Sequence, residues 1–78
     1  MDANQKIKEI LKKNKKNQQE LADFMGISKK TLDTKFYRGG FYADELIQVA
    51  DFLGFKLAFI NDDEQIIFDT SEIKRSEN

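Results

Sequence analysis

The sequence of 78 residues contains no cysteine, histidine, proline or tryptophan. Without cysteine and histidine, the chain lacks the ligands of an ordinary zinc site, a disulfide framework, a thiol nucleophile and a Ser-His-Asp triad. Its apolar runs, such as Leu57–Ile60, are far shorter than the roughly 20 residues that cross a bilayer, and no signal-peptide core precedes them. We therefore expect a small cytoplasmic protein with no metal, no cofactor and no membrane contact.

Catalytic patterns are also lacking. No pair of carboxylates has a recognisable catalytic spacing, and the acidic cluster Asp62–Glu64 is typical of a turn because it lacks the ligand spacing of a calcium loop. An enzyme is therefore the least favoured class of function. A chain of this length buries only about 60 to 65% of its unfolded surface, so it needs tidy helix packing or a second subunit.

The net charge of −1 conceals an uneven distribution. Up to Gly39 the chain has ten basic and five acidic side chains, a balance of +5, and after Gly39 it has three basic and nine acidic ones, a balance of −6. Such asymmetry indicates a face for nucleic acid or another anionic surface. The lysine-rich segment from Lys12 to Lys16 can equally be a solvated helix end, whose cations complement the helix dipole.

Apolar residues at helical spacing predict four helices, at about 3–14, 18–25, 29–37 and 43–53. Asn17 is a suitable N-cap for the second helix and Ser28 for the third. Gly26 ends the second helix, and Gly39 suits a left-handed position after the third. The residues expected to be buried in the fourth helix are Leu46, Val49, Ala50 and Leu53.

After Gly54 the apolar period changes from 3.6 to 2, which predicts strands at 55–60 and 65–70 joined by a polar turn. Ile66 and Phe68 are expected on one face of this β-hairpin and Ile67 on the other. Because an isolated hairpin is marginal and has free edges, we expect a second copy to pair with it. The fold class is mainly α with a small β addition, followed by a polar tail, 71–78, that frays.

Residues 18–32 read QQELADFMGISKKTL, with Gln at the first helix, Leu-Ala at the crossing, Gly in the turn and Ile-Ser before the second helix. In these features the segment resembles the Cro/C1-type (XRE, lambda repressor-like) helix-turn-helix family, and the likeness extends more loosely over about 6–54. It implies a four-helix lambda repressor-like DNA-binding core, 1–54, with the helix-turn-helix at about 18–37. The hairpin, 55–70, looks like the β-extension of Cro-like members and is the expected dimer interface within the same domain.

In that family the second helix of the motif lies in the major groove and the first crosses the DNA backbone. The resemblance thus implies that 29–37 is the recognition helix. The residues that it implies for DNA binding are Gln18, Ser28, Lys29, Lys30, Thr31, Thr34, Lys35 and Arg38. Asp33 can accept from a cytosine amino group or pair with Lys29 or Lys30, and we favour the pairing.

The loop after the recognition helix departs from the family pattern. Many members carry an aromatic-Glu-Asn-Gly stretch and then basic residues, whereas this chain continues from Phe36 to Glu45 with Arg38 as its only cation. Phe41 and Tyr42 can line a ligand or anchor the loop, and we favour the anchor. Because phosphate contacts are few here, we expect the protein to hold DNA as a homodimer.

We therefore expect a sequence-specific DNA-binding transcriptional regulator, a repressor of bacterial or phage type. Its partners would be a double-stranded DNA operator, which would bring it to the nucleoid, and a second copy bound through the C-terminal hairpin. The alternative is a protein-binding module, such as an antitoxin or a phage-encoded inhibitor, that keeps the fold and uses its acidic half to occupy a protein partner.

Overall fold

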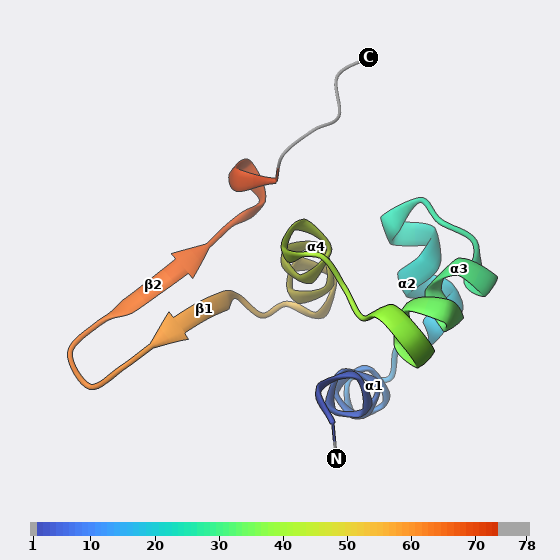
Figure 1. Ribbon diagram of the computed structural model, residues 1–78, viewed down its shortest axis with the longest axis horizontal. Coiled ribbons are helices and arrows are strands. Elements are labelled where there is room, and N and C mark those ends of the chain that lie inside the picture. Colours follow the sequence, from blue (N-terminus) through green and yellow to red (C-terminus); the bar gives the residue numbers. More distant parts are fainter. Residues whose placement is uncertain (1, 74–78) are drawn as a thin grey trace. The chain divides into compact units, whose positions relative to one another are not determined.

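A computed structural model describes residues 2–73 and is shown in Figure 1. It contains the helices α1 (Ala3–Lys13), α2 (Gln18–Met25), α3 (Lys29–Thr34) and α4 (Ala43–Leu53), and the strands β1 (Leu57–Ile60) and β2 (Gln65–Phe68). The predicted fold class, four helices and a C-terminal hairpin, is confirmed. Within residues 2–73, no helix combines the length and the apolar character that a bilayer crossing requires.

The described residues form two compact units. The first runs to Phe41 and holds α1, α2, α3 and a π-helical turn, η1 (Lys35–Gly39). The second begins at Tyr42 and holds α4, the hairpin and a short 3₁₀ turn, η2 (Thr70–Glu72).

Side-chain caps fix where the helices of the first unit begin. The Asn17 side chain accepts a hydrogen bond from the Glu20 N–H at 2.8 Å, and Glu20 accepts in return from the Asn17 N–H at 2.9 Å. This reciprocal capping box starts α2, as predicted. Asp2 and Gln5 form another at the start of α1. Gly26, with φ +74°, ends α2 in the left-handed conformation that glycine tolerates best.

The first unit packs around a small apolar core. Its buried residues are Leu11, Leu21, Ala22, Leu32 and Phe36. Leu21 and Leu32 have no exposed surface, so they lie at the centre of this core. Phe41 follows η1, and its ring meets that of Phe36 edge-on at 5.2 Å, so Phe41 anchors the loop as predicted. Tyr42, by contrast, is 77% exposed.

The third helix differs from its prediction at the C-terminal end. Regular α-helix stops at Thr34, and the chain continues as η1 because the Gly40 N–H donates to the Lys35 carbonyl, five residues back, at 2.7 Å. Gly39 lies inside η1, and Gly40 after it combines a φ of +73° with a ψ of −162°, which is not the left-handed helical conformation, so the left-handed position predicted for Gly39 was wrong. The wider turn therefore takes in Tyr37 and Arg38.

The buried face of α4 was predicted only in part. Ile47 and Val49 are buried, whereas Leu46, Ala50 and Leu53 are half-buried. Ile47 and Val49 are two positions apart, about 200° around a helix, so they do not lie on one narrow stripe of α4. A pattern with a single apolar stripe could not find Ile47 for this reason.

The hairpin pairs Leu57 with Phe68 and Phe59 with Ile66, so these four side chains share one face. Ile67 lies opposite Ala58 and therefore on the other face, as predicted. The rings of Phe59 and Phe68 pack diagonally across the strands at 5.3 Å. Both strands are shorter than predicted.

The residues after the hairpin also differ from the prediction of a fraying tail. Thr70–Glu72 form η2, capped by Asp69, whose carboxylate accepts from the Ser71 N–H at 3.0 Å. A side-chain cap thus orders the start of the predicted tail. The rest of that tail, 74–78, lies outside the described residues.

Candidate nucleic-acid interface

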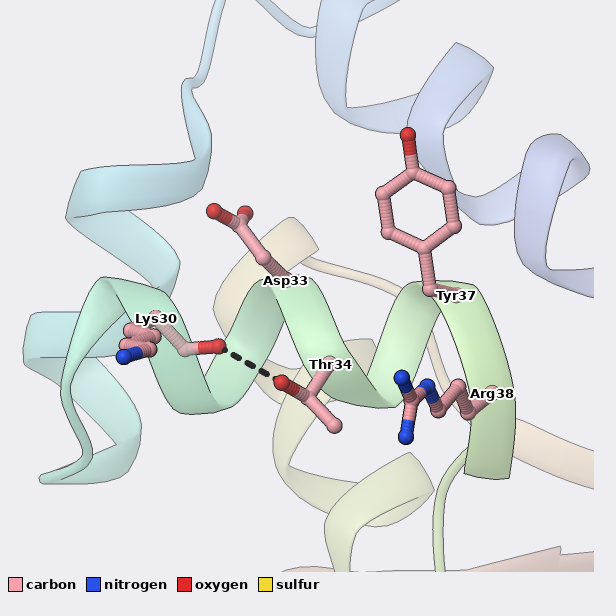
Figure 2. Close-up of a pocket in the computed structure, with 5 residues that line it drawn as sticks. All are labelled: Lys30, Asp33, Thr34, Tyr37 and Arg38. Carbon is pink, nitrogen blue, oxygen red and sulfur yellow. Dashed lines mark hydrogen bonds between the residues drawn. The ribbon is translucent and has the colours of Figure 1, made fainter.

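One side of α3 and η1 forms an open cleft of about 400 Å³ (Figure 2). The residues that line it are Lys30, Asp33, Thr34, Tyr37 and Arg38. Their spacing of three and four positions brings them to the same side of a helical segment. Three of the residues predicted to bind DNA, Lys30, Thr34 and Arg38, therefore meet at one surface.

The two cationic side chains of the cleft form no ion pair with the described residues. Lys30 and Arg38 are exposed, and neither side chain has a hydrogen bond or ion pair to any residue within 2–73. Their charges are therefore available to an anionic partner. Figure 2 shows both on the same side of the helix, with Thr34 between them.

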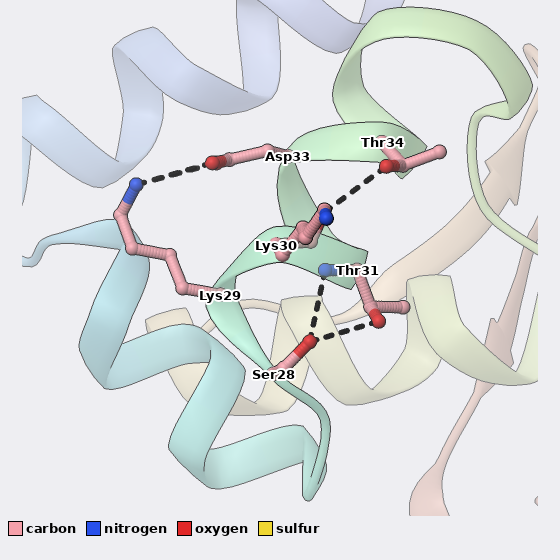
Figure 3. Close-up of polar contacts among 6 residues, drawn as sticks. All are labelled: Ser28, Lys29, Lys30, Thr31, Asp33 and Thr34. Carbon is pink, nitrogen blue, oxygen red and sulfur yellow. Dashed lines mark hydrogen bonds and ion pairs between the residues drawn. The ribbon is translucent and has the colours of Figure 1, made fainter.

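Asp33 would oppose such a partner if its charge stood alone. Instead, Lys29 Nζ lies 3.2 Å from Asp33 Oδ2, one helical turn away, as Figure 3 shows. The pairing with Lys29 confirms one of the two predicted for Asp33. An exposed pair of this kind contributes only about 0.3 to 0.5 kcal/mol to stability. Its larger effect is to offset the one negative charge in the cleft.

Ser28 fixes the N-terminus of α3. Its hydroxyl oxygen accepts from the Thr31 N–H at 3.0 Å, and the hydroxyl donates to Thr31 Oγ1 at 2.9 Å (Figure 3). The predicted N-cap is confirmed. The Thr31 hydroxyl accepts in this bond, and its own proton has no acceptor within residues 2–73, so it can donate to a ligand.

Thr34 binds the backbone of its own helix. Its hydroxyl donates to the Lys30 carbonyl at 3.1 Å (Figure 2). This arrangement turns the polar atom toward the helix and leaves the methyl group for outside contacts.

Tyr37 was missing from the predicted site. It is 84% exposed, and Lys8 of α1 lies with Nζ 5.6 Å from the Tyr37 ring centroid and 5.3 Å from that of Phe36. These distances are within the range of cation–π attraction. The signal that could have found Tyr37 was its position four residues after Asp33.

The other predicted residues do not line the cleft. Gln18, half-buried, is the first residue of α2, and Lys35 is half-buried at the start of η1. The Lys35 and Phe36 carbonyls accept from Asn4 Nδ2 at 3.5 and 3.0 Å, which ties η1 to α1. Sequence reasoning missed Asn4 because 31 residues separate it from Lys35.

The chain matches a known protein family. Residues 2–64 match the model of the bacteriophage CI repressor helix-turn-helix domain, which spans most of the chain and every predicted DNA-binding residue. This finding confirms the helix-turn-helix resemblance that residues 18–32 indicated. Searches of curated proteins and of solved structures returned no match.

Proposed function

The chain belongs to the bacteriophage CI repressor helix-turn-helix family, a family of DNA-binding regulators, and on this premise we propose that it is a sequence-specific transcriptional repressor. The observation that carries the proposal is the cleft on α3 and η1, with two unengaged cations and a neutralised carboxylate. In this role α3 lies in the major groove of an operator, and the protein resides on the nucleoid.

The cleft offers a distinct chemistry at each position. Lys30, near the N-terminus of α3, donates to guanine O6 and N7, and the Thr34 methyl group meets a thymine methyl. Arg38, at the far end of the helix, binds a phosphate. Because Lys29 neutralises Asp33, the cleft is not repelled by the DNA backbone.

Residues around the cleft set the register on the duplex. Gln18 begins the crossing helix, where its side chain and the unsatisfied backbone N–H groups suit a phosphate oxygen. Ser28 and Thr31 open α3 and contact base edges or phosphates, and Lys35 binds phosphate at the helix end.

We also propose that the protein binds its operator as a homodimer through the hairpin. Phe59, Ile60, Ile66 and Ile67 are 68, 71, 48 and 49% exposed, so apolar side chains project from both faces of a two-stranded sheet with free edges. Such a surface is unfavourable in water and suits a second copy. A two-fold dimer would read two half-sites about one helical turn apart.

A salt titration of binding to a short, mixed-sequence DNA duplex tests the function. The logarithm of the wild-type binding constant should fall linearly with the logarithm of salt concentration, with a slope that implies several neutralised phosphates. Lys30→Glu and Arg38→Ala should each weaken binding and reduce the slope by at least about 0.9. Lys6→Glu, an exposed charge change on α1, is the matched control and should have little effect.

Two outcomes would overturn this proposal. One is absence of DNA binding at low salt by wild-type protein shown to be folded. The other is an equal loss of binding in Lys6→Glu and Lys30→Glu, because the cleft would then contribute nothing beyond overall charge.

The molecular mass from analytical ultracentrifugation tests whether the hairpin forms the dimer interface. Ile67→Lys should lower the mass toward that of a monomer at concentrations where the wild type is dimeric, while thermal stability of the dilute protein changes little. Phe24→Lys is a matched control, because Phe24 is 48% exposed but belongs to the first unit. An unchanged mass in Ile67→Lys would remove the hairpin as the interface.

A further inference from the structure

The end of α1 has an unusual backbone conformation. Lys15 has a φ of +60° and is the one non-glycine residue with positive φ in the described chain, residues 2–73. Its N–H donates to the Lys12 carbonyl at 3.0 Å, and the Lys16 N–H donates to the Leu11 carbonyl at 2.9 Å. These two bonds form a Schellman motif, with Lys15 at the left-handed C′ position.

A lysine fits this position poorly. The side-chain Cβ of an L-residue clashes with the backbone in the left-handed region, so helices that end this way usually have glycine or asparagine at C′. The chain follows that rule at Gly26 after α2 and at Gly54 after α4, with φ of +74° and +80°. Lys15 is therefore the exception among the three helix ends.

No contact of the Lys15 side chain offsets this cost. The side chain is exposed and has no hydrogen bond or ion pair to another described residue. The helix dipole accounts for Lys12 and Lys13, which lie in the last turn of α1, but Lys15 lies beyond that turn. Neither a side-chain contact nor the helix dipole therefore explains why a lysine occupies this position.

The surroundings of Lys15 favour an anionic ligand. It lies among Lys12, Lys13 and Lys16, with no acidic residue between Glu9 and Glu20. It also comes three residues before Gln18, where α2 exposes its unsatisfied backbone N–H groups. Cationic side chains and free N–H groups together are the usual partners of DNA phosphates.

We propose that the turn from Lys12 to Lys16 extends the phosphate contact already proposed for Gln18, with Lys15 as a further side chain that contacts the DNA backbone beside the α3 contact. This inference rests on the proposed function. Lysine persists at a position suited to glycine because the charge contributes to DNA binding, at some cost to stability.

Lys15→Gly separates the two effects, because they have opposite signs. The thermal midpoint should rise by about 4 °C as the backbone clash is removed. The affinity for a mixed-sequence duplex should fall roughly eightfold at roughly 0.1 M salt, and the salt slope should decrease by about 0.9 as one phosphate contact is lost. A purely structural role would not weaken DNA binding in a more stable protein.

Two further variants isolate the charge. Lys15→Asn keeps a residue that tolerates positive φ but removes the charge, so it should lose affinity as Lys15→Gly does. Lys15→Arg retains the charge and should keep the wild-type slope. Lys6→Gln removes one positive charge at another exposed position of α1. It controls for the change in net charge and should bind DNA as the wild type does.

Wild-type affinity and slope in Lys15→Gly and Lys15→Asn would overturn the inference while leaving the proposed function standing. Equal losses in Lys15→Asn and Lys6→Gln would also overturn it. Failure of the wild type to bind the duplex would instead reject the proposed function, and this inference with it.

Discussion

The two units of the chain use their apolar residues in opposite ways. Among residues 2–73, the first unit buries five apolar side chains and leaves two large ones, Phe24 and Tyr37, well exposed. The second buries two, Ile47 and Val49. Its large exposed residues are Tyr42, Phe55, Phe59, Ile60, Ile66 and Ile67.

The charges differ in the same way. The first unit carries a balance of +5 and the second a balance of −6. A basic surface on a well-packed core suits phosphate binding, whereas exposed apolar strands on an acidic unit suit self-association. This contrast fits the proposal that the first unit binds DNA and the second mediates self-association.

The largest expected effect is on the core of the first unit. Leu21→Ala removes a fully buried side chain and should lower the free energy of unfolding by about 2 to 5 kcal/mol, measured by urea denaturation of dilute protein. Ile60→Ala, at a position 71% exposed, should cost less than about 0.5 kcal/mol under the same conditions. Equal losses of unfolding free energy in the two variants would show that the hairpin buries an apolar core of its own.

Helix caps give a smaller effect. Ser28→Ala removes the oxygen that accepts from the Thr31 N–H and should lower the free energy of unfolding by about 1 kcal/mol. Ser28→Asp keeps an acceptor at that position and should retain most of the stability. Loss of stability in both variants to the same extent would show that packing, not capping, matters at Ser28.

The smallest expected effect is the titration of Asp69 in the second unit. Hydrogen bonds from the Ser71 side chain and backbone, with a weaker contribution from the charge of Lys56, hold the pKa of Asp69 below its usual value. A carboxyl whose pKa is lowered by folding stabilises the protein above its unfolded pKa, and that stability is lost as the pH falls through the folded pKa. Because Asp69 is exposed, the change in stability should be slight.

Carboxyl NMR can follow this titration directly. Ser71→Ala should move the Asp69 pKa back toward its usual value, and Thr70→Val, which leaves both Ser71 bonds in place, should not. An unchanged pKa in Ser71→Ala would mean that the Ser71 hydroxyl contributes nothing to the lowered pKa of Asp69.

The sequence predicted those features that depend on neighbours along the chain. The Asn17 and Ser28 caps, the turn at Gly26 and the two faces of the hairpin each follow from residues a few positions apart, and all are confirmed. The pairing of Lys29 with Asp33 is local in the same sense.

Features set by distant residues were not predictable in this way. The π-helical turn depends on the bond from Gly40 to Lys35 and on Asn4, whose amide reaches the Phe36 carbonyl from α1. Tyr37 belongs to that turn and lines the cleft. Ile47 is buried although it lies off the expected apolar stripe of α4, which apolar spacing along one helix does not reveal.

We propose that the first unit binds DNA and that the hairpin does not. An NMR titration of ¹⁵N-labelled protein with a mixed-sequence duplex at low salt tests it most directly. We predict that amide signals of residues 28–38, and of the turn before Gln18, shift with added DNA while those of β1 and β2 stay unchanged. Shifts confined to the hairpin, with the signals of residues 28–38 unchanged, would show that the hairpin and not α3 binds the duplex.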